Sequence, residues 1–273
     1  MKQNKWKNAF SGGALWLFAL LVIVPFLLVA WNSLKSKGEA NLMNFAWPSE
    51  FHFENITYVW KKSNMLRAFF NSLLIAVVPV FFSTVFSAMA TFALSRNRTR
   101  VNRVIYKAFI LGLVLPINML PTIRVLKTVG LMGSYAGIIL LYSALLIPLA
   151  VFLYYSFISG IPRSLDEAAL IDGAGGLRMF FSIVFPLLKP VTVTVVIMNF
   201  MNAWNDFLIP LYILNNSNKW GMILQVYNYY GLYQSNWNHV CAVVVLALLP
   251  VVIVYIIGQK YIISGMTAGS VKG

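Results

Sequence analysis

Four residues near the middle of an apolar stretch could contact a polar solute, and one of them is the acid Asp206. A charge inside a bilayer costs about 2.5–3.5 kcal/mol on insertion scales, so Asp206 should face a cavity or a polar group. Asn199, Asn202 and Asp206 recur at helical spacing and would share one helix face, a candidate lining for a translocation path. Trp204 could stack on a solute there. A structural contact with another subunit explains the same pattern, and both interpretations stay open.

A second candidate site is the segment 161–186, whose pattern favours a docking surface rather than catalysis. Ser164 and Glu167 have capping-box spacing, which predicts that a helix begins at Ser164. Gly173 can adopt the left-handed conformation that ends such a helix. A second short helix is predicted from Leu177 to Phe185, with Pro186 closing the unit.

The predicted helix–turn–helix has features suited to binding another protein. Its first helix carries the small residues Ala168 and Ala169, which allow close approach. Its second helix would offer an apolar face made of Met179, Phe180, Phe181 and Ile183. The segment could also be an ordinary connector.

The sequence lacks the patterns of an enzyme. It has no Gly-x-x-x-x-Gly-Lys-Ser/Thr phosphate loop, no nucleophile–base set and no cluster of metal-ligating residues. His52 and His239 are expected at the surface, and Cys241, the only cysteine, is expected to pack in an apolar helix. We therefore expect no catalytic residue, no metal and no cofactor in this chain.

The composition indicates a membrane protein. Of 273 residues, 60% are hydrophobic and 10% are charged, against about 45–50% and about 25% in soluble domains. The net charge is +14, which in a soluble protein would suggest a nucleic-acid partner. Here the basic residues lie between apolar runs, where they set orientation, so no nucleic-acid partner is expected.

The apolar stretches predict an all-α fold, because a spanning helix needs about 20 apolar residues. The six stretches that qualify are Gly12–Trp31, Phe69–Leu94, Val104–Leu126, Ser134–Phe157, Ile183–Leu214 and Val240–Tyr261. Pro116 and Pro121 should kink or break the third. The fifth should begin as a tilted segment outside the membrane and span only after Pro190.

The basic residues predict which loops are cytoplasmic. Thirteen of the 21 Lys and Arg lie on the side of both termini and of segment 161–186, and eight lie on the other side. The first side should therefore be cytoplasmic. The cluster Arg96, Arg98, Arg100 and Arg103 is the strongest signal and could also contact lipid headgroups. The long outer loop Asn32–Arg67 is expected to lie at the membrane surface.

The predicted organisation has three parts. Residues 1–66 form the first span and the outer loop, and residues 67–261 form the core with the cytoplasmic loop 161–186. Residues 262–273 form a cytoplasmic tail, whose glycines favour an extended strand between protein surfaces, with a disordered terminus as the alternative.

The segment 161–186 resembles the signature loop of the permeases of binding-protein-dependent ABC importers. That pattern is Glu-Ala-Ala, three residues, Gly, nine residues, Ile, one residue and Leu-Pro. The residues here that match it or lie within it as coupling candidates are Glu167, Ala168, Ala169, Asp172, Gly173, Ile183 and Pro186. Phe185 replaces the usual Leu, and Gly175-Gly176 replaces a Ser or Thr that would cap the second helix, which could cost about 1 kcal/mol.

The resemblance extends over most of the chain and favours the carbohydrate-uptake branch. Asn71-Ser72-Leu73, Leu115-Pro116, Leu120-Pro121, Val129-Gly130-Leu131 and Trp204-Asn205-Asp206-Phe207 are similar to that branch. The ending 264–273 looks like the tail of the smaller permease subunit of maltose-type systems.

The resemblance implies a type I ABC importer permease in a bacterial plasma membrane. It would pair with a second, homologous permease, two ATPase subunits and an extracytoplasmic solute-binding protein, with membrane lipid around it. ATP and Mg would bind to the ATPases, which would receive segment 161–186 as a coupling helix. The tail would contact them through residues such as Gly265, Thr267, Gly269 and Lys272.

The implied cargo is an oligosaccharide or another carbohydrate, moved by alternating access, and Trp204 could then stack on a sugar. In maltose-type systems the partner permease can hold the sugar alone, so direct contact with cargo stays open. A glycerol phosphate or another small polar solute remains an alternative cargo. An ion-coupled secondary transporter is a weaker alternative, because such proteins need intramembrane carboxylates and usually inverted repeats. A membrane-embedded enzyme is also weaker.

Overall fold

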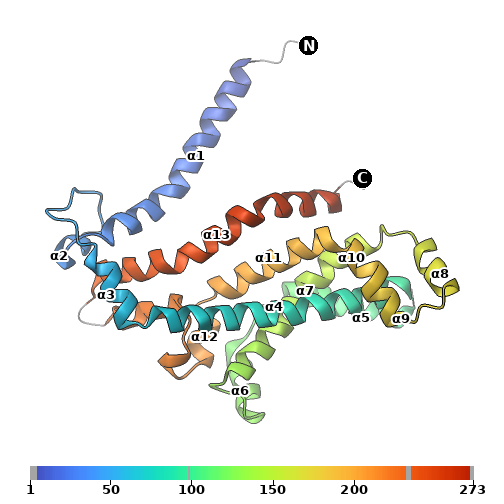
Figure 1. Cartoon of the computed structure of the whole chain (residues 1–273). Helices are drawn as coiled ribbons and strands as arrows, with labels where there is room; N and C mark the ends of the chain where they lie inside the picture. The colour runs from blue at the N-terminus through green and yellow to red at the C-terminus, as the bar shows by residue number, and fades with distance from the viewer. Residues whose placement is uncertain (1–4, 98, 232–234, 271–273) are drawn as a thin grey trace. The chain divides into compact units, whose positions relative to one another are not determined.

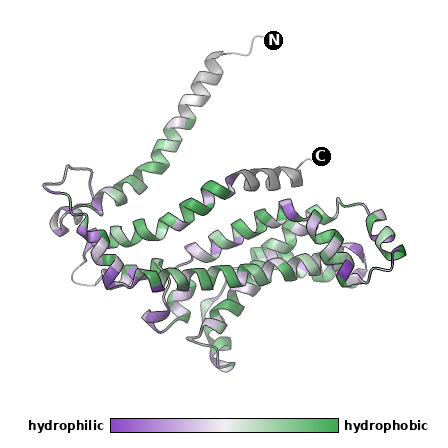
Figure 2. Cartoon of the chain, in the orientation of Figure 1, coloured by the Kyte–Doolittle hydropathy of each residue, from purple (hydrophilic) through white to green (hydrophobic). Residues whose placement is uncertain are grey.

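The computed structural model describes residues 5–97, 99–231 and 235–270, and these form an α-helical membrane protein (Figure 1). Four helices are long and apolar enough to cross a membrane, and two bent helix pairs bring the number to six if each pair is one span. The four helices are α1 Lys5–Asn32, α4 Met65–Arg96, α7 Tyr135–Ile158 and α13 Trp237–Ser270. The prediction of an all-α fold with six spans is confirmed. Figure 2 shows that the coloured parts of these helices are predominantly apolar.

The third predicted span is broken at the expected place. Helix α5, Arg100–Val114, ends before Leu115, whose ψ of 123° is extended because Pro116 disfavours the helical conformation in the residue before it. Helix α6, Met119–Thr128, then follows and is capped by the Asn118 side chain, which accepts from the N–H of Leu120. The two helices meet at 116°.

The fifth predicted span also begins as a separate segment. Helix α9 Gly176–Met179, the π-helix η1 Phe180–Val184 and α10 Phe185–Leu187 run continuously, and α11 Lys189–Asn205 follows at 80°. Pro190 lies in the first turn of α11, where its missing N–H is tolerated. The predicted end at Leu214 is wrong, because α11 stops at Asn205 and a short helix α12, Leu208–Ile213, follows.

The chain forms two compact units. The first comprises residues 1–68 and 222–249, with α2 Lys37–Ala40, α3 Glu54–Lys62 and the short 3₁₀ helix η3 Ile223–Asn228. Its polar core fixes the outer loop: the buried Lys35 donates to both oxygens of Asn44, at 2.8 and 3.0 Å. Asn55 donates to the carbonyls of Ser33 and Lys35 and accepts from Asn238.

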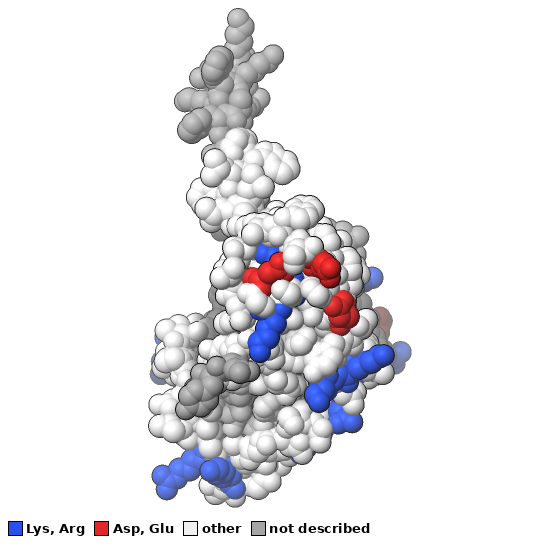
Figure 3. All heavy atoms as spheres, turned by 90° about the vertical axis from the view of Figure 1, so that its left-hand side faces the viewer, with Lys and Arg blue, Asp and Glu red and all other residues white. Residues whose placement is uncertain are grey.

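The same unit carries a mixed charged surface around α2 and α3, seen in Figure 3 as acidic side chains beside basic ones. Its acids are Glu39, Glu50 and Glu54. Hydrogen bonds from the backbone N–H of Ser49 and from the side chain of Ser36 lower the pKa of Glu39 to about 2. The lowered pKa keeps Glu39 ionised in mildly acidic solution as well as at neutral pH, and its hydrogen bonds join residues 36 to 49.

The second unit comprises residues 69–221 and 250–273. In it, α7 packs against both α5 and α11 (Figure 1). A buried cluster joins α4, α7 and α11 to the segment after α7, and its members include Ala88, Tyr154, Ile158, Ala169, Phe180, Val184 and Val195. The short 3₁₀ helix η2, Ser217–Lys219, also lies in this unit.

Helix α13 passes residue 262, the predicted start of the tail, without a break. The prediction of an extended strand is therefore wrong for residues 265–270, which are helical and include Gly265, Thr267 and Gly269. Lys272 lies outside the described residues. The contact of this segment with ATPases stays a prediction.

Candidate functional site

The helix that carries the Glu-Ala-Ala sequence, α8, spans Ser164–Ile171. The predicted capping box is wrong, because Arg163 already has helical angles (φ −70°, ψ −22°) and occupies the N-cap position without a side-chain bond. Ser164 therefore lies inside the first turn. Asp166 and Glu167 lie in that turn too, where the positive end of the helix dipole favours carboxylates.

The predicted turn at Gly173 is confirmed. Its φ of +74° lies in the left-handed region, and two hydrogen bonds close the end of α8. Gly173 N–H donates to the Leu170 carbonyl at 3.0 Å, and Ala174 N–H donates to the Ala169 carbonyl at 2.9 Å. These two bonds form a Schellman motif, and Ala169 and Ala174 supply its buried apolar contact.

The second helix begins without a side-chain cap, as the Gly175-Gly176 sequence predicts. The prediction that this helix offers an exposed apolar face is largely wrong, because most of that face is buried. Met179 and Phe180 are buried in the core cluster, and Ile183 packs partly against it. Phe181 remains exposed. The helix uses its apolar side chains to attach itself to α4 and α7.

The exposed side of the turn region is the better docking surface. Glu167 and Ala168 are exposed, whereas Ala169 faces the core. Sequence reasoning missed the large apolar residues Leu170, Ile171 and Leu177, which are 61%, 87% and 65% exposed. Apolar groups gathered on a connector beside charged residues are typical of protein-binding sites. Their apolar character beside the Glu-Ala-Ala sequence was the available signal.

The remaining predicted residues of the segment, Asp172 and Pro186, lie at the surface. Asp172 is the exposed C-cap of α8, and Pro186 is exposed in α10. The Glu167 carboxylate has no ion pair among the described residues, so it is available to a partner. We call Glu167, Ala168, Leu170, Ile171 and Leu177 the docking surface.

The polar residues of α11 do not form the single face expected from their spacing. Asn199 is fully buried and donates to Ser83 Oγ and to the Leu146 carbonyl, both at 3.3 Å. Trp204 is buried and packs against Phe69 and Phe200. Asn202 is exposed.

Asp206 lies beyond the helix, with an extended ψ of 125°, so its predicted place on the helical face is wrong. Its Oδ1 accepts hydrogen bonds from the N–H groups of Leu208 at 2.9 Å and Ile209 at 3.2 Å. The carboxylate therefore caps α12.

Replacing Asp206 by Ala should destabilise the permease by about 1 kcal/mol, because the cap of α12 is lost. Asp206→Asn keeps an acceptor oxygen and should cost only a few tenths of a kcal/mol. Thermal unfolding of the two variants in the same detergent measures the difference. Equal destabilisation by both would show that the charge, rather than the cap, matters.

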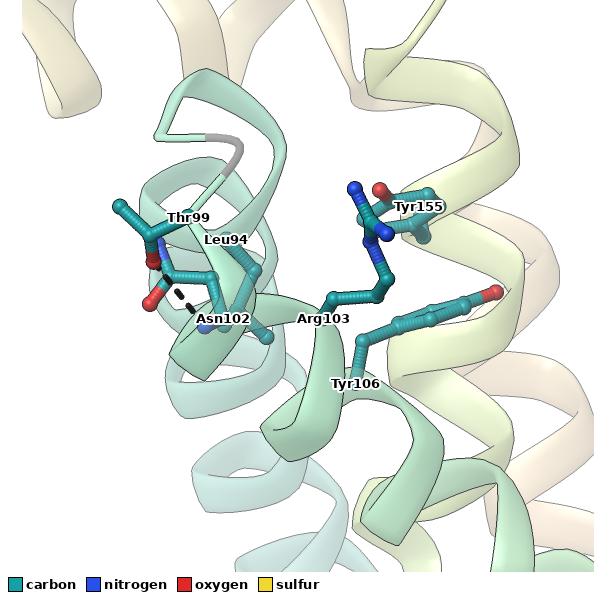
Figure 4. A pocket seen from close by; sticks show the side chains of 6 residues that line it. All are labelled: Leu94, Thr99, Asn102, Arg103, Tyr106 and Tyr155. Carbon is teal, nitrogen blue, oxygen red and sulfur yellow. Dashed lines mark hydrogen bonds between the residues drawn. The ribbon is translucent and has the colours of Figure 1, made fainter.

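A pocket of about 250 Å³ lies where the end of α4, the start of α5 and the second half of α7 meet. Its lining residues are Leu94, Thr99, Asn102, Arg103, Tyr106 and Tyr155. Figure 4 shows the Arg103 side chain extending beside Tyr155, while Thr99 caps α5 by accepting from the N–H of Asn102. The Tyr106 and Tyr155 rings stack with centroids 4.0 Å apart. The pocket therefore combines one cation with hydrogen-bonding groups at the end of a span.

Within the described part of the chain, no group of three or more His, Cys, Asp or Glu residues could hold a metal ion. His52 is half-buried, and His239 stacks on Tyr58 at 4.7 Å rather than lying free on the surface. Cys241 is buried, as expected for a packing residue.

Comparison with known proteins identifies a family. Residues 83–268 match the family model described as binding-protein-dependent transport system inner membrane component. The chain is 33% identical to the melibiose/raffinose/stachyose import permease protein MelC of Bacillus subtilis, over 92% of this chain and 91% of that protein.

A second named permease and one solved structure are also similar to this chain. The chain is 35% identical to the multiple sugar-binding transport system permease protein MsmG of Streptococcus mutans, over 93% of both chains. One solved structure, a bacterial ABC transporter involved in the import of the acidic polysaccharide alginate, has a similar fold. The TM-score is 0.81 at 22% identity, covering 96% of this chain and 98% of that one.

Proposed function

The chain belongs to the family of inner membrane components of binding-protein-dependent transport systems, and from this we propose that it is a permease subunit of an ATP-driven carbohydrate importer. As a member of this family it is a multi-pass transport subunit rather than an enzyme. The proposal that α8 receives an ATPase rests on the exposed apolar end of α8, next to Glu167, which has no ion pair among the residues that the structure describes. ATP and Mg would act on partner ATPases.

The docking surface would receive an ATPase subunit. Its large apolar side chains favour a protein partner, because Leu170 and Ile171 lie on a connector outside the candidate spans. The buried side of α8 is attached to the transmembrane core through Ala169, and the turn after α8 is attached through Ala174. A force applied to α8 would therefore reach the spans. The helical segment 265–270, with Lys272, would be a second contact with the ATPases.

We assign the docking surface and both termini to the cytoplasm. The basic residues Arg96, Arg100 and Arg103 lie close in sequence to the end of α4, and Arg96 contacts α8. Positive residues are retained on the cytoplasmic side of a membrane. The outer loop around α2 and α3 would then face the solute-binding protein. The surface of this loop carries both acidic and basic side chains (Figure 3).

A second permease is proposed because α1 leaves so much apolar surface uncovered. Only 6% of its spanning window is buried within this chain. Lipid or another permease must cover that surface in the membrane.

We propose that anionic lipid headgroups bind in the pocket at Arg103, since basic pockets at the cytoplasmic ends of spans bind them.

Carbohydrate is the proposed cargo because the similar permeases have sugar-import names. Asn202, which is exposed on α11, and Asp206, which is partly exposed just after it, are the candidates for the translocation path. Asn199 and Trp204 would reach cargo only after a rearrangement, because both are buried.

Uptake by cells that carry the complete importer, with and without this chain, tests the cargo. A panel of labelled oligosaccharides, monosaccharides and glycerol phosphates should show chain-dependent uptake of an oligosaccharide or another carbohydrate. Uptake of glycerol phosphate alone would replace carbohydrate by the alternative cargo.

A further inference from the structure

Reciprocal bonds join α8 to the end of α4, the span that ends at Arg96. Arg96 Nε lies 2.5 Å from Asp166 Oδ2, and Nη2 donates to Oδ1 at 3.3 Å. Arg96 Nη1 also donates to the Ile161 carbonyl at 3.2 Å. In return, Arg163 Nη2 donates to the carbonyls of Ser95 and Arg96, at 3.4 and 3.2 Å. Because the last carbonyls of a helix lack partners within it, Arg163 caps α4.

The ion pair is shielded from water. The Arg96 and Asp166 side chains are only 14% and 13% exposed, so solvent and salt screen their attraction less than at a surface. The Arg96 guanidinium also lies over the Phe92 ring, 5.8 Å from its centroid. Phe92 in turn contacts Phe180 of η1, with centroids 5.7 Å apart. Arg96 therefore connects α4 to α8, and Phe92 of the same helix connects α4 to η1.

Two adjacent acids of α8 have opposite surroundings. Asp166 faces the permease and pairs with Arg96, whereas Glu167 is exposed and has no ion pair in the described part of the chain. We propose that Arg96 and Asp166 are positioning residues that fasten the docking helix α8 to the span α4, so that both move as one body. This inference rests on the proposed function, in which an ATPase binds to α8.

Loss of this ion pair should affect the coupling of ATP hydrolysis to transport rather than the assembly of the importer. Without the ion pair, α8 keeps its Schellman turn and its docking surface, and Ala169 still packs in the core. The ATPase can bind and hydrolyse ATP, but its movement is transmitted less completely to α4. Substrate transported per ATP hydrolysed is therefore the quantity that the pair controls.

The test uses the complete importer in proteoliposomes, with Asp166→Asn, which keeps the side-chain shape and removes the charge. Arg178→Gln, at an exposed cation of the same segment, is the control. We expect Asp166→Asn to retain the ATPase and its hydrolysis rate while transport per ATP falls about tenfold, because one charge-assisted interaction is lost. The control should match the wild-type ratio.

A crosslink asks whether α8 and α4 move together. Arg96→Cys and Asp166→Cys are combined in a Cys241→Ala background and joined by a short bifunctional thiol reagent. Before crosslinking, the double-cysteine variant should hydrolyse ATP with little transport. After crosslinking, it should recover most of the wild-type transport per ATP.

Three results would overturn the inference while leaving the proposed function intact. The first is that Asp166→Asn transports as much substrate per ATP hydrolysed as the wild type. The second is that this variant loses the ATPase. The third is that the crosslinked form does not transport, because α8 must move relative to α4. If the wild-type chain itself assembles with no ATPase, the proposed function fails instead.

Discussion

Replacing Ile171 by Glu should remove the ATPase from the importer while the permease remains folded in the membrane. Ile171 is 87% exposed at the end of α8, so the substitution disturbs no core packing. A buried interface position that loses an apolar anchor and gains a charge should behave as a hot spot, costing at least about 2 kcal/mol, or roughly 30-fold in affinity. Binding of the purified ATPase to permease in lipid nanodiscs measures the loss.

Ile171→Val is the matched control, because it preserves the apolar character and most of the volume. Its ATPase affinity should stay close to wild type. Thermal unfolding of Ile171→Glu should also be unchanged. Wild-type affinity in the Glu variant would show that the ATPase binds elsewhere.

Replacing Gly173 by Val should weaken both ATPase binding and transport several-fold. A Cβ at this position would meet no atom within 4 Å, so the cost lies in the backbone, whose φ is +74°. The left-handed conformation costs a residue with a side chain about 1–2 kcal/mol, and a β-branched residue fits it worst. The strain should open the Schellman turn and misdirect Leu170 and Ile171.

Gly173→Asn separates backbone strain from the loss of glycine itself. Asn adopts the left-handed conformation more readily than other residues with side chains, so this variant should transport near the wild-type rate. Initial uptake rates of the two variants at equal membrane levels give the comparison. Equal loss in both would mean that the surface around Gly173, rather than its conformation, is needed.

Local rules predicted the features that depend on a single residue. Pro116 restricts the residue before it, so the break between α5 and α6 follows from the sequence. Gly173 was predictable for the same kind of reason, since few residues can end a helix in the left-handed region. The absence of a cap at Gly175 also follows from residue type.

Features that depend on distant contacts were not predictable. The side of η1 that is buried is decided by Tyr154 and Phe92, which belong to other helices. The burial of Asn199 depends on Ser83, which lies 116 residues earlier. Helical spacing placed Asp206 on the face of α11 only by assuming that the helix continued past Asn205.

The energy source for transport decides whether this chain works in an ATP-driven importer. Proteoliposomes that contain the complete importer, with the solute-binding protein outside, should take up carbohydrate only when ATP is enclosed. Collapse of proton and sodium gradients should leave the rate unchanged, and Ile171→Glu should abolish it. Uptake driven by an ion gradient without ATP would contradict the account.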